Sequence, residues 1–214
     1  MKAKILEGKV LETLKDVPPC SVQCVVTSPP YYGMRNYGVD GQIGLEPSPE
    51  AYVETLVNVF REVRRVLKDD GTLWLNLGDS YWGGKGQSSQ AWSTEHQDRD
   101  TLQKAQHQIT GKGETRPTDG KHPVIKPKDL IGIPWMVAFA LRADGWYLRQ
   151  DIIWNKPNPM PESMTDRCTK SHEYIFLLSK SKVYYFDQEA IKEPAAIESL
   201  ERLQRGVSDH HKNV

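Results

Sequence analysis

Four consecutive residues, Ser28, Pro29, Pro30 and Tyr31, form a rigid corner directly after the apolar stretch at 21–27. Each proline fixes its own φ and pushes the preceding residue into an extended conformation, so the Ser28 hydroxyl and the nearby carbonyls are held in one geometry. Such oxygens can accept the protons of a planar NH2 group. The Tyr31 ring offers a flat face for a base, and such stacking is worth about 1–3 kcal/mol per base in single-strand binders. The corner therefore predicts a pocket for a base that carries an amino group.

Two further groups of residues are candidates for contacts with the same substrate. The first group follows the corner and consists of Tyr32, Arg35, Asn36 and Tyr37. The second ends a later strand and consists of Trp154, Asn155 and Lys156. Side chains of these types bind nucleotide bases and phosphates. A charged turn is also commonly plain solvated surface, and Trp154 is equally suited to a core, so both interpretations stay open at this point.

The sequence contains no pattern typical of a metal site. Its cysteines, Cys20, Cys24 and Cys168, match neither zinc spacing nor a redox pair, and we expect reduced thiols. His172 and Glu173 are adjacent, but they lack a partner four residues away or a cysteine cluster, so a structural role is expected for them. We therefore expect no metal.

The elements that must position these residues alternate between strand and helix. Apolar runs at 4–8, 21–28, 72–77 and 151–154 predict buried strands. Ser48 and Pro49 predict the start of a helix that ends before Gly71, and Pro134 predicts the start of another. The runs at 174–180 and 183–187 predict an antiparallel hairpin at a sheet edge. This order predicts an α/β fold with a mainly parallel sheet, and it puts Ser28 at the carboxyl end of a strand, where open sheets bind ligands.

The composition is that of an ordinary globular chain, with 214 residues, no net charge and a mean hydropathy of −0.60. No run approaches the roughly eighteen apolar residues of a membrane helix, and the start is too charged for a signal peptide. We expect one cytoplasmic domain over 1–214 that does not contact membranes. Residues 83–128 form a polar insertion with eight Lys or Arg and five Asp or Glu. A solvated loop and an arm that contacts DNA both fit this segment.

The stretch SPPY after a strand resembles the catalytic motif of the beta-class DNA amino-methyltransferases, which transfer a methyl group from S-adenosylmethionine to cytosine N4 or adenine N6. The similarity covers most of the chain and includes LEGKVLETL, DLIGIPW, DGWYLRQDIIWNKPNPMPES and SHEYIFLLSKSKVYYFD. It implies a partial Rossmann-like sheet, S-adenosylmethionine bound near Ser28 and Pro29, and double-stranded DNA with a flipped target base. Serine at the first motif position resembles the cytosine-N4 branch more than the adenine branch. The resemblance thus predicts a site-specific cytosine-N4 methyltransferase with Ser28 to Tyr31 as catalytic residues, and adenine N6 is the alternative target.

The chain also departs from the pattern of that family. The glycine-rich S-adenosylmethionine loop of the type D-P-F-x-G-x-G does not occur in the sequence, and Lys9 stands where an acidic residue is usual. By the same resemblance, the strand at 4–8 would be the third of the sheet and that at 24–28 the fourth, so the first and second strands between them are missing. We therefore expect an incomplete catalytic domain that a C-terminal segment or a second chain completes. The alternative is a truncated DNA-binding remnant without catalysis.

Overall fold

A computed structural model describes residues 3–83, 117–118, 120–159, 161–162 and 164–194 of the chain. Two units are distinguished, residues 1–184 and residues 185–214. The described part of the second unit contains the short 3-10 helix η2 (Glu189–Ile191), in which the Asp187 carboxylate accepts a hydrogen bond from the Ala190 N–H at 3.0 Å. The first unit contains the sheet and the helices that position the site, and the expectation of a single domain over 1–214 stays a prediction.

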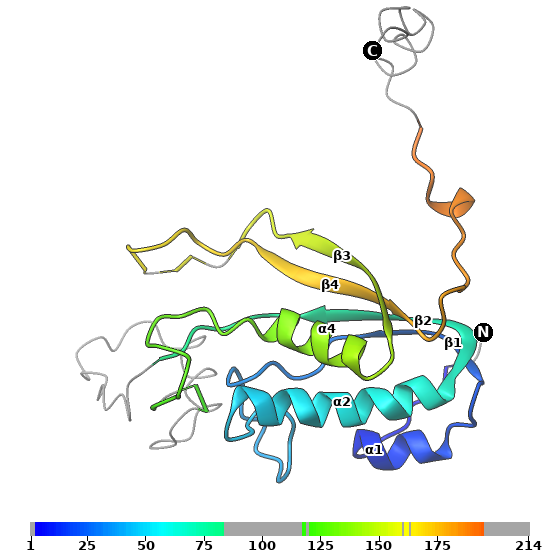
Figure 1. The fold of residues 1–214 in the computed structure, drawn as a ribbon, viewed down its shortest axis with the longest axis horizontal. Helices are drawn as coiled ribbons and strands as arrows, with labels where there is room; N and C mark the ends of the chain where they lie inside the picture. The colour runs from blue at the N-terminus through cyan, green and yellow to red at the C-terminus, as the bar shows by residue number, and fades with distance from the viewer. Residues whose placement is uncertain (1–2, 84–116, 119, 160, 163, 195–214) are drawn as a thin grey trace, which may run out of the picture. The chain divides into compact units, whose positions relative to one another are not determined.

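The sheet of the first unit has four strands in the order β1-β2-β4-β3 (Figure 1). These strands are β1 (Val22–Thr27), β2 (Leu67–Leu77), β3 (Tyr147–Asn155) and β4 (His172–Ser179). β1 and β2 are parallel, whereas β4 is antiparallel to both β2 and β3. The predicted α/β class is confirmed, but the prediction of a mainly parallel sheet is wrong, since two of the three pairings are antiparallel.

An antiparallel pair does lie at one edge of the sheet, as predicted, but its strands are β3 and β4. The prediction paired the run at 174–180 with the run at 183–187, and that pairing is wrong. Residues 183–187 form no strand, and Val183, Tyr185 and Phe186 are exposed. The short gap between the two apolar runs suggested a turn. β4 instead pairs with β2 and with the earlier strand β3.

Two helices cover one face of this sheet, α2 (Pro49–Val66) and α4 (Ile133–Ala143) (Figure 1). The Ser48 side chain caps α2 by accepting a hydrogen bond from the Ala51 N–H at 3.2 Å, as the sequence predicts. The helix ends at Val66 and not near Gly71, because Leu67 is already extended and begins β2. Pro134 lies in the first turn of α4, which is also as predicted. A shorter helical segment precedes β1 and consists of α1 (Val10–Thr13) and the 3-10 helix η1 (Leu14–Asp16).

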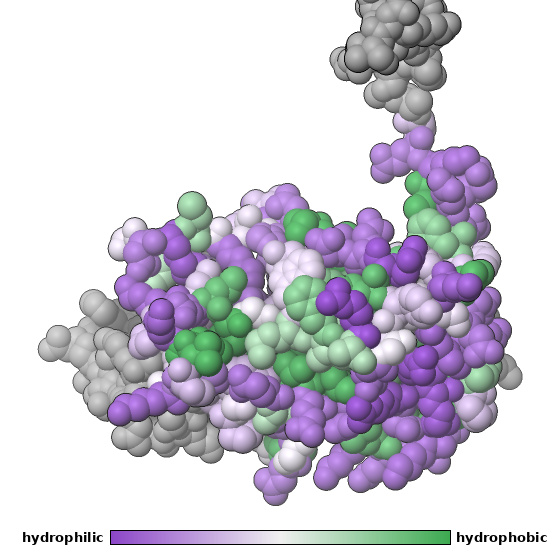
Figure 2. Space-filling view, in the orientation of Figure 1, coloured by the Kyte–Doolittle hydropathy of each residue, from purple (hydrophilic) through white to green (hydrophobic). Residues whose placement is uncertain are grey.

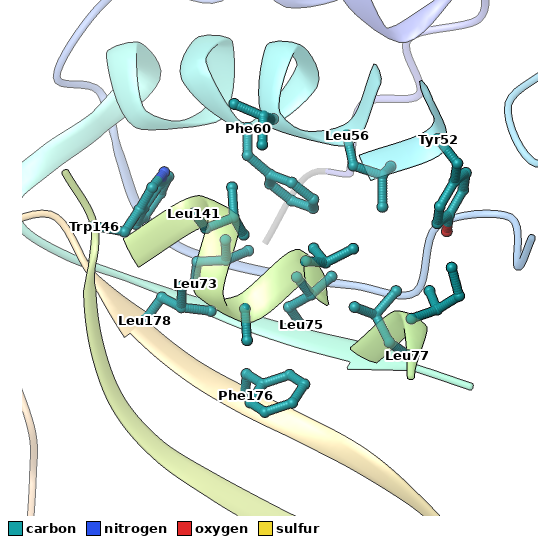
Figure 3. Packing of buried hydrophobic residues seen from close by; sticks show 14 of the residues in the cluster. Tyr52, Leu56, Phe60, Leu73, Leu75, Leu77, Leu141, Trp146, Phe176 and Leu178 are labelled. Atoms are coloured by element: carbon teal, nitrogen blue, oxygen red, sulfur yellow. The ribbon is translucent and has the colours of Figure 1, made fainter. Parts of the chain in front are cut away.

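The core lies between these helices and the sheet (Figure 3). Alternate residues of β2 and β4 point into it, and so do residues of the two helices at helical spacing. The fully buried members include Leu73, Leu75, Leu77, Phe176, Leu178, Tyr52, Leu56, Phe60 and Leu141. Burial of each such apolar side chain contributes about 1.5–3 kcal/mol. This packing fixes the carboxyl ends of β1 and β2, where the predicted site lies.

The strand predicted at residues 4–8 does not form, and this correction concerns the edge of the sheet. Residues 3–7 have no regular structure, and Ile5 is 92% exposed. Among the described residues β1 pairs with β2 alone, so its other edge has no strand partner. A short strand needs a neighbour to pair its backbone N–H and C=O groups, and none stands beside residues 4–8. In the described part of the chain no helix has the length and apolar character to cross a membrane.

Candidate active site

The corner at Ser28 lies directly after β1, at the carboxyl ends of the two parallel strands. The Ser28 side chain is exposed, and Pro29 and Pro30 are half-buried. Tyr52 of α2 holds the corner from beneath, because its hydroxyl donates a hydrogen bond to the backbone oxygen of Pro30 at 2.8 Å. The corner is therefore fixed by the core while the Ser28 hydroxyl faces outward.

Tyr31 connects this corner to the neighbouring strands. Its ring lies so close to Gly78 that a Cβ at that residue would come within 2.3 Å of Cε2 of the ring. The phenol oxygen has three polar neighbours, which are Ser28 Oγ at 3.3 Å, Asn76 Oδ1 at 2.8 Å and Glu173 Oε2 at 2.9 Å. Burial raises the pKa of Tyr31 to about 12; Glu173 acts in the same direction, and the hydrogen bond from Ser28 opposes it. The phenol therefore keeps its proton at neutral pH and acts as a donor.

Glu173 joins the corner to the end of β3. Its Oε2 accepts the hydrogen bond from Tyr31, and its Oε1 pairs with the Lys156 ammonium. Burial alone would raise the pKa of Glu173, but hydrogen bonds from Lys156 and Tyr31 outweigh it and hold the pKa below its usual value. The Lys156 Nζ also lies 5.3 Å from the centre of the Trp154 ring. One half-buried carboxylate thus links Tyr31 to Lys156 and, through Lys156, to Trp154.

The other predicted contact residues are less closely gathered. Arg35 and Tyr37 are exposed on a loop that Gln42 closes, since its side chain accepts from the Tyr37 N–H and donates to the Arg35 backbone oxygen. Asn36 accepts a hydrogen bond from the Gly38 N–H at 2.8 Å within the same loop. Asn155 is exposed at the end of β3.

Tyr32 requires a correction, because it does not face a ligand. Its side chain is 1% exposed, and its ring lies 5.5 Å from that of Tyr52 in the core. Its hydroxyl donates to the backbone oxygen of Pro117. Two aromatic residues follow the prolines, and the second of them, Tyr32, packs in the core. Tyr32 therefore supports the corner from inside.

Residues 22–212 match the model of a family described as DNA methylase, which covers N6 and N4 methyltransferases. The chain belongs to this DNA methylase family. Among its relatives, the Type II methyltransferase M.SmaI of Serratia marcescens is 52% identical over 202 residues, which are 94% of this chain and 64% of M.SmaI. M.Cfr9I of Citrobacter freundii is 49% identical and is aligned over 89% of this chain and 59% of its own length. The chain therefore spans less than two thirds of these relatives.

The fold of this chain also resembles a solved structure, that of the cytosine-N4-specific PvuII DNA methyltransferase. The TM-score is 0.55 with 15% sequence identity, and the match covers 95% of this chain and 63% of the other. The likeness supports the expected partial Rossmann-like sheet. S-adenosylmethionine is the cofactor that membership of the family implies, as the sequence predicts.

The described part of the chain contains an apolar cavity beside the Ser28 corner. An apolar cavity of about 470 Å³ lies along β1, between η1 and α2, and Val26, Ser28, Pro29 and Val59 are among its lining residues. S-adenosylmethionine carries charged groups and hydroxyls that need hydrogen-bonding partners when they are buried. Of the residues that line the cavity, Thr27 and Ser28 alone have polar side chains. The lining of this cavity therefore does not fit the polar ends of the cofactor, in agreement with the absence of the glycine-rich loop from the sequence.

Asp79 and Lys170 are two charged groups near the site that the sequence did not indicate. The Asp79 carboxylate accepts hydrogen bonds from the Gly132 and Ile133 N–H groups at 3.0 and 3.1 Å and so fixes the start of α4. Burial raises the pKa of Asp79 despite the opposing charge of Lys170. Burial likewise lowers the pKa of Lys170, against the effects of Asp79 and Glu173. No group of metal-binding side chains occurs among the described residues.

The insertion begins and ends beside the site. The residues that flank it pair with each other, since the Trp82 N–H donates to the Asp129 oxygen at 2.9 Å. Within it, the Gly83 N–H donates to the Thr118 oxygen at 2.9 Å. The Arg167 guanidinium lies 3.9 Å from the centre of the Tyr81 ring at the same place. The insertion also contains glutamines and an arginine, side-chain types that are suited to base-edge contacts, and these lie outside the described residues; they are Gln87, Gln90, Gln103, Gln106, Gln108 and Arg116.

The sequence missed the roles of Asn76 and Glu173 at this site. Each is a polar residue inside an otherwise apolar strand, which is the signal that was available. The sequence did not show that β4 runs antiparallel to β2. If β4 were parallel to β2, Glu173 would lie at the opposite end of the strands from Tyr31. Because β4 is antiparallel, Glu173 lies beside Tyr31.

Proposed function

We propose that this chain is the catalytic part of a site-specific DNA methyltransferase. The enzyme transfers a methyl group from S-adenosylmethionine to the exocyclic amine of a flipped base, and the proposed target atom is cytosine N4. The observation that carries the proposal is the exposed Ser28 side chain beside the half-buried Tyr31–Glu173 hydrogen bond, in a chain of the DNA methylase family. Double-stranded DNA is the proposed partner, and the reaction would take place in the cytoplasm.

The proposed chemistry needs little from the protein beyond alignment. An amine nitrogen of a base is a poor nucleophile while its lone pair is conjugated with the ring. Ser28 Oγ and the carbonyl of a corner proline accept hydrogen bonds from the amine N–H groups, which draws the lone pair out of conjugation. The methylated nitrogen then releases one proton to water. The exposed face of Tyr31 stacks on the flipped base, whereas Gly78 covers the ring from one side. Holding the two reactants in line supplies most of the acceleration, so no covalent enzyme intermediate is required.

The residues at 35–37 and 154–156 are proposed contacts to the flipped nucleotide and its phosphates. Lys156 supports this role best, because its ammonium lies beside both Glu173 and the Trp154 ring. An ammonium has three N–H donors, so it can bind a phosphate while it keeps its contact with Glu173.

The choice of cytosine N4 rests on Ser28 at the first motif position. Nucleosides from DNA treated with the active enzyme are separated and identified by mass spectrometry. We expect N4-methylcytosine. N6-methyladenine as the sole product would replace cytosine by adenine in the proposal, and no methylated base at all would reject it.

We further propose that polypeptide beyond these 214 residues completes the cofactor site along the free edge of β1. The cavity beside β1 and the exposed Val26 offer an apolar surface there, and the relatives are half as long again as the aligned part of this chain. The 214 residues alone would then bind DNA without transferring methyl groups.

Calorimetry tests whether polypeptide beyond the 214 residues is needed for cofactor binding. S-adenosylmethionine is titrated into the 214-residue chain alone and into the same chain joined to the part of M.SmaI that lies outside the alignment. We expect binding in the second case only. Binding of millimolar cofactor by the 214 residues alone would contradict the proposal.

A further inference from the structure

We propose that Glu173 is a positioning residue for methyl transfer. Through Tyr31, its carboxylate turns the Ser28 hydroxyl so that the lone pairs of Ser28 Oγ face the target amine. The inference rests on the proposed function and deepens it, since it assigns a role in the site to a residue outside the SPPY corner.

The argument starts from the proton of the Tyr31 phenol. That single proton has three oxygen neighbours, in Asn76, Glu173 and Ser28, at 2.8, 2.9 and 3.3 Å. The Asn76 amide donates through Nδ2 to the Tyr174 backbone oxygen at 3.2 Å, so its Oδ1 is the atom that faces the phenol. The ionised Glu173 carboxylate and Asn76 Oδ1 can only accept. A hydrogen bond to an ionised oxygen is about twice as strong as one to a neutral oxygen, so Glu173 is the preferred partner of this proton.

The orientation of Ser28 follows from that preference. Once its proton is directed to Glu173, the phenol oxygen is an acceptor, and the Ser28 hydroxyl donates to it. Both lone pairs of Ser28 Oγ are then available for the amine. Without Glu173, the neutral Asn76 Oδ1 is the only acceptor besides Ser28 Oγ among these neighbours, so the phenol proton is held less firmly. Part of the time it then turns toward Ser28 Oγ and competes with the amine for those lone pairs.

The surroundings of Glu173 hold it in this position. Its side chain is 17% exposed, so water competes little for the carboxylate. Its two oxygens have different partners, because Lys156 binds Oε1 and Tyr31 binds Oε2. The plane of the carboxylate is thereby fixed from two sides, which a single contact would not achieve.

A double-mutant cycle tests the inference in the completed enzyme. Glu173→Ala and Tyr31→Phe are each expected to lower kcat about tenfold, the size of one lost hydrogen bond to a charged group, with KM for DNA changed by less than about twofold. Because Glu173 acts through the phenol, the double variant should be no slower than the slower single variant. Glu62→Ala is the matched control, since Glu62 is also ion-paired, with Arg65 at 2.8 Å, but lies toward the other end of α2 from Tyr52. Multiplied effects in the double variant, or an unchanged kcat in Glu173→Ala, would overturn the inference.

A second readout does not depend on catalysis. In the 214-residue chain with ¹³C-labelled tyrosine rings, the Cζ signal of Tyr31 is assigned by its loss in Tyr31→Phe. Glu173→Ala should shift this signal and leave those of the other tyrosines, while Glu62→Ala should not. An unmoved signal overturns the inference. A shifted signal together with a wild-type enzyme that transfers no methyl group would support the contact and reject the proposed function instead.

Discussion

The ring of Tyr31 lies against the backbone of Gly78, the first residue after β2, with no room for a side chain between them. Glycine at this position therefore allows the tyrosine of the SPPY corner to reach Asn76 and Glu173. The contact joins the end of one parallel strand to the end of the next, and it fixes the position of the ring.

Gly78→Ala is expected to push the Tyr31 ring out of place, because the new Cβ would lie 2.3 Å from Cε2. Overpacking of this kind costs about 1–3 kcal/mol of unfolding free energy. Urea denaturation of the 214-residue chain measures the loss. Combining Gly78→Ala with Tyr31→Ala should restore much of the stability by making room; a double variant as unstable as the sum of both would point to another cause.

Ser28→Ala should lower the rate of methyl transfer by the completed enzyme at least tenfold and leave DNA affinity nearly unchanged. The lost contact belongs to the reacting geometry more than to ground-state binding. Single-turnover transfer and fluorescence anisotropy with labelled duplex measure the two quantities. Ser21→Ala, at the opposite end of β1, is the control and should retain full activity. Equal rates for Ser28→Ala and wild type would remove Ser28 from the proposed mechanism.

Glu173→Gln should make folding stability less dependent on acid. The folded protein holds the pKa of Glu173 below its value in the unfolded chain, about 4.3, so the ionised form favours folding. The contribution is present above that value and is lost as the pH falls through the lower folded pKa. We expect the wild type to be more stable than Glu173→Gln at pH 7 and the difference to vanish at low pH in urea titrations. A difference that is independent of pH would mean that the charge of Glu173 does not stabilise the fold.

Val26→Asp separates the fold of the 214 residues from assembly of the cofactor site. Val26 is 79% exposed at the free edge of β1, so the change should alter the unfolding free energy by less than about 0.5 kcal/mol. The same change puts a charge on the surface where the completing polypeptide is proposed to bind. Cofactor binding by the completed enzyme should be lost, as measured by calorimetry. Val183→Asp, at a residue 73% exposed away from the cavity, should bind normally, and normal binding by Val26→Asp would argue against docking at this edge.

Replacing residues 84–116 with a short glycine linker tests whether the insertion selects the target. This segment contains five Lys or Arg and four Asp or Glu, so its removal changes the net charge by one. Each phosphate contact contributes about 0.9 to the slope of log affinity against log salt, so that slope should change little. Sequence preference should be lost if its glutamines contact base edges. Unaltered methylation sites in the shortened, completed enzyme would make the segment a surface loop.

Local signals predicted the elements whose causes are local. The Ser48 cap, the position of Pro134 and the alternation of leucines in β2 each appear in the sequence and in the structure. The position of Ser28 at a strand end followed from the same signals. The position of the proline corner and its tyrosine could therefore be predicted from the sequence.

The direction and the partners of the strands could not be predicted from local sequence. Residues 4–8 have the composition of a strand, but the pairing that a strand needs lies outside its own sequence. The same holds for residues 183–187. Glu173 reaches Tyr31 only because β4 is antiparallel to β2, a relationship between residues about a hundred positions apart.

The two ends of the insertion are joined to each other before the chain leaves for residues 84–116. An isolated bridge pairs Tyr81 with Leu130, and backbone hydrogen bonds run from Trp82 to Asp129 and from Lys128 to Trp82. A segment mounted on such a stem can be exchanged for one of another length or sequence without moving β2 or α4. If the insertion selects the target, exchange of this one segment would change which DNA site is bound, while Ser28 and Tyr31 would remain where they are.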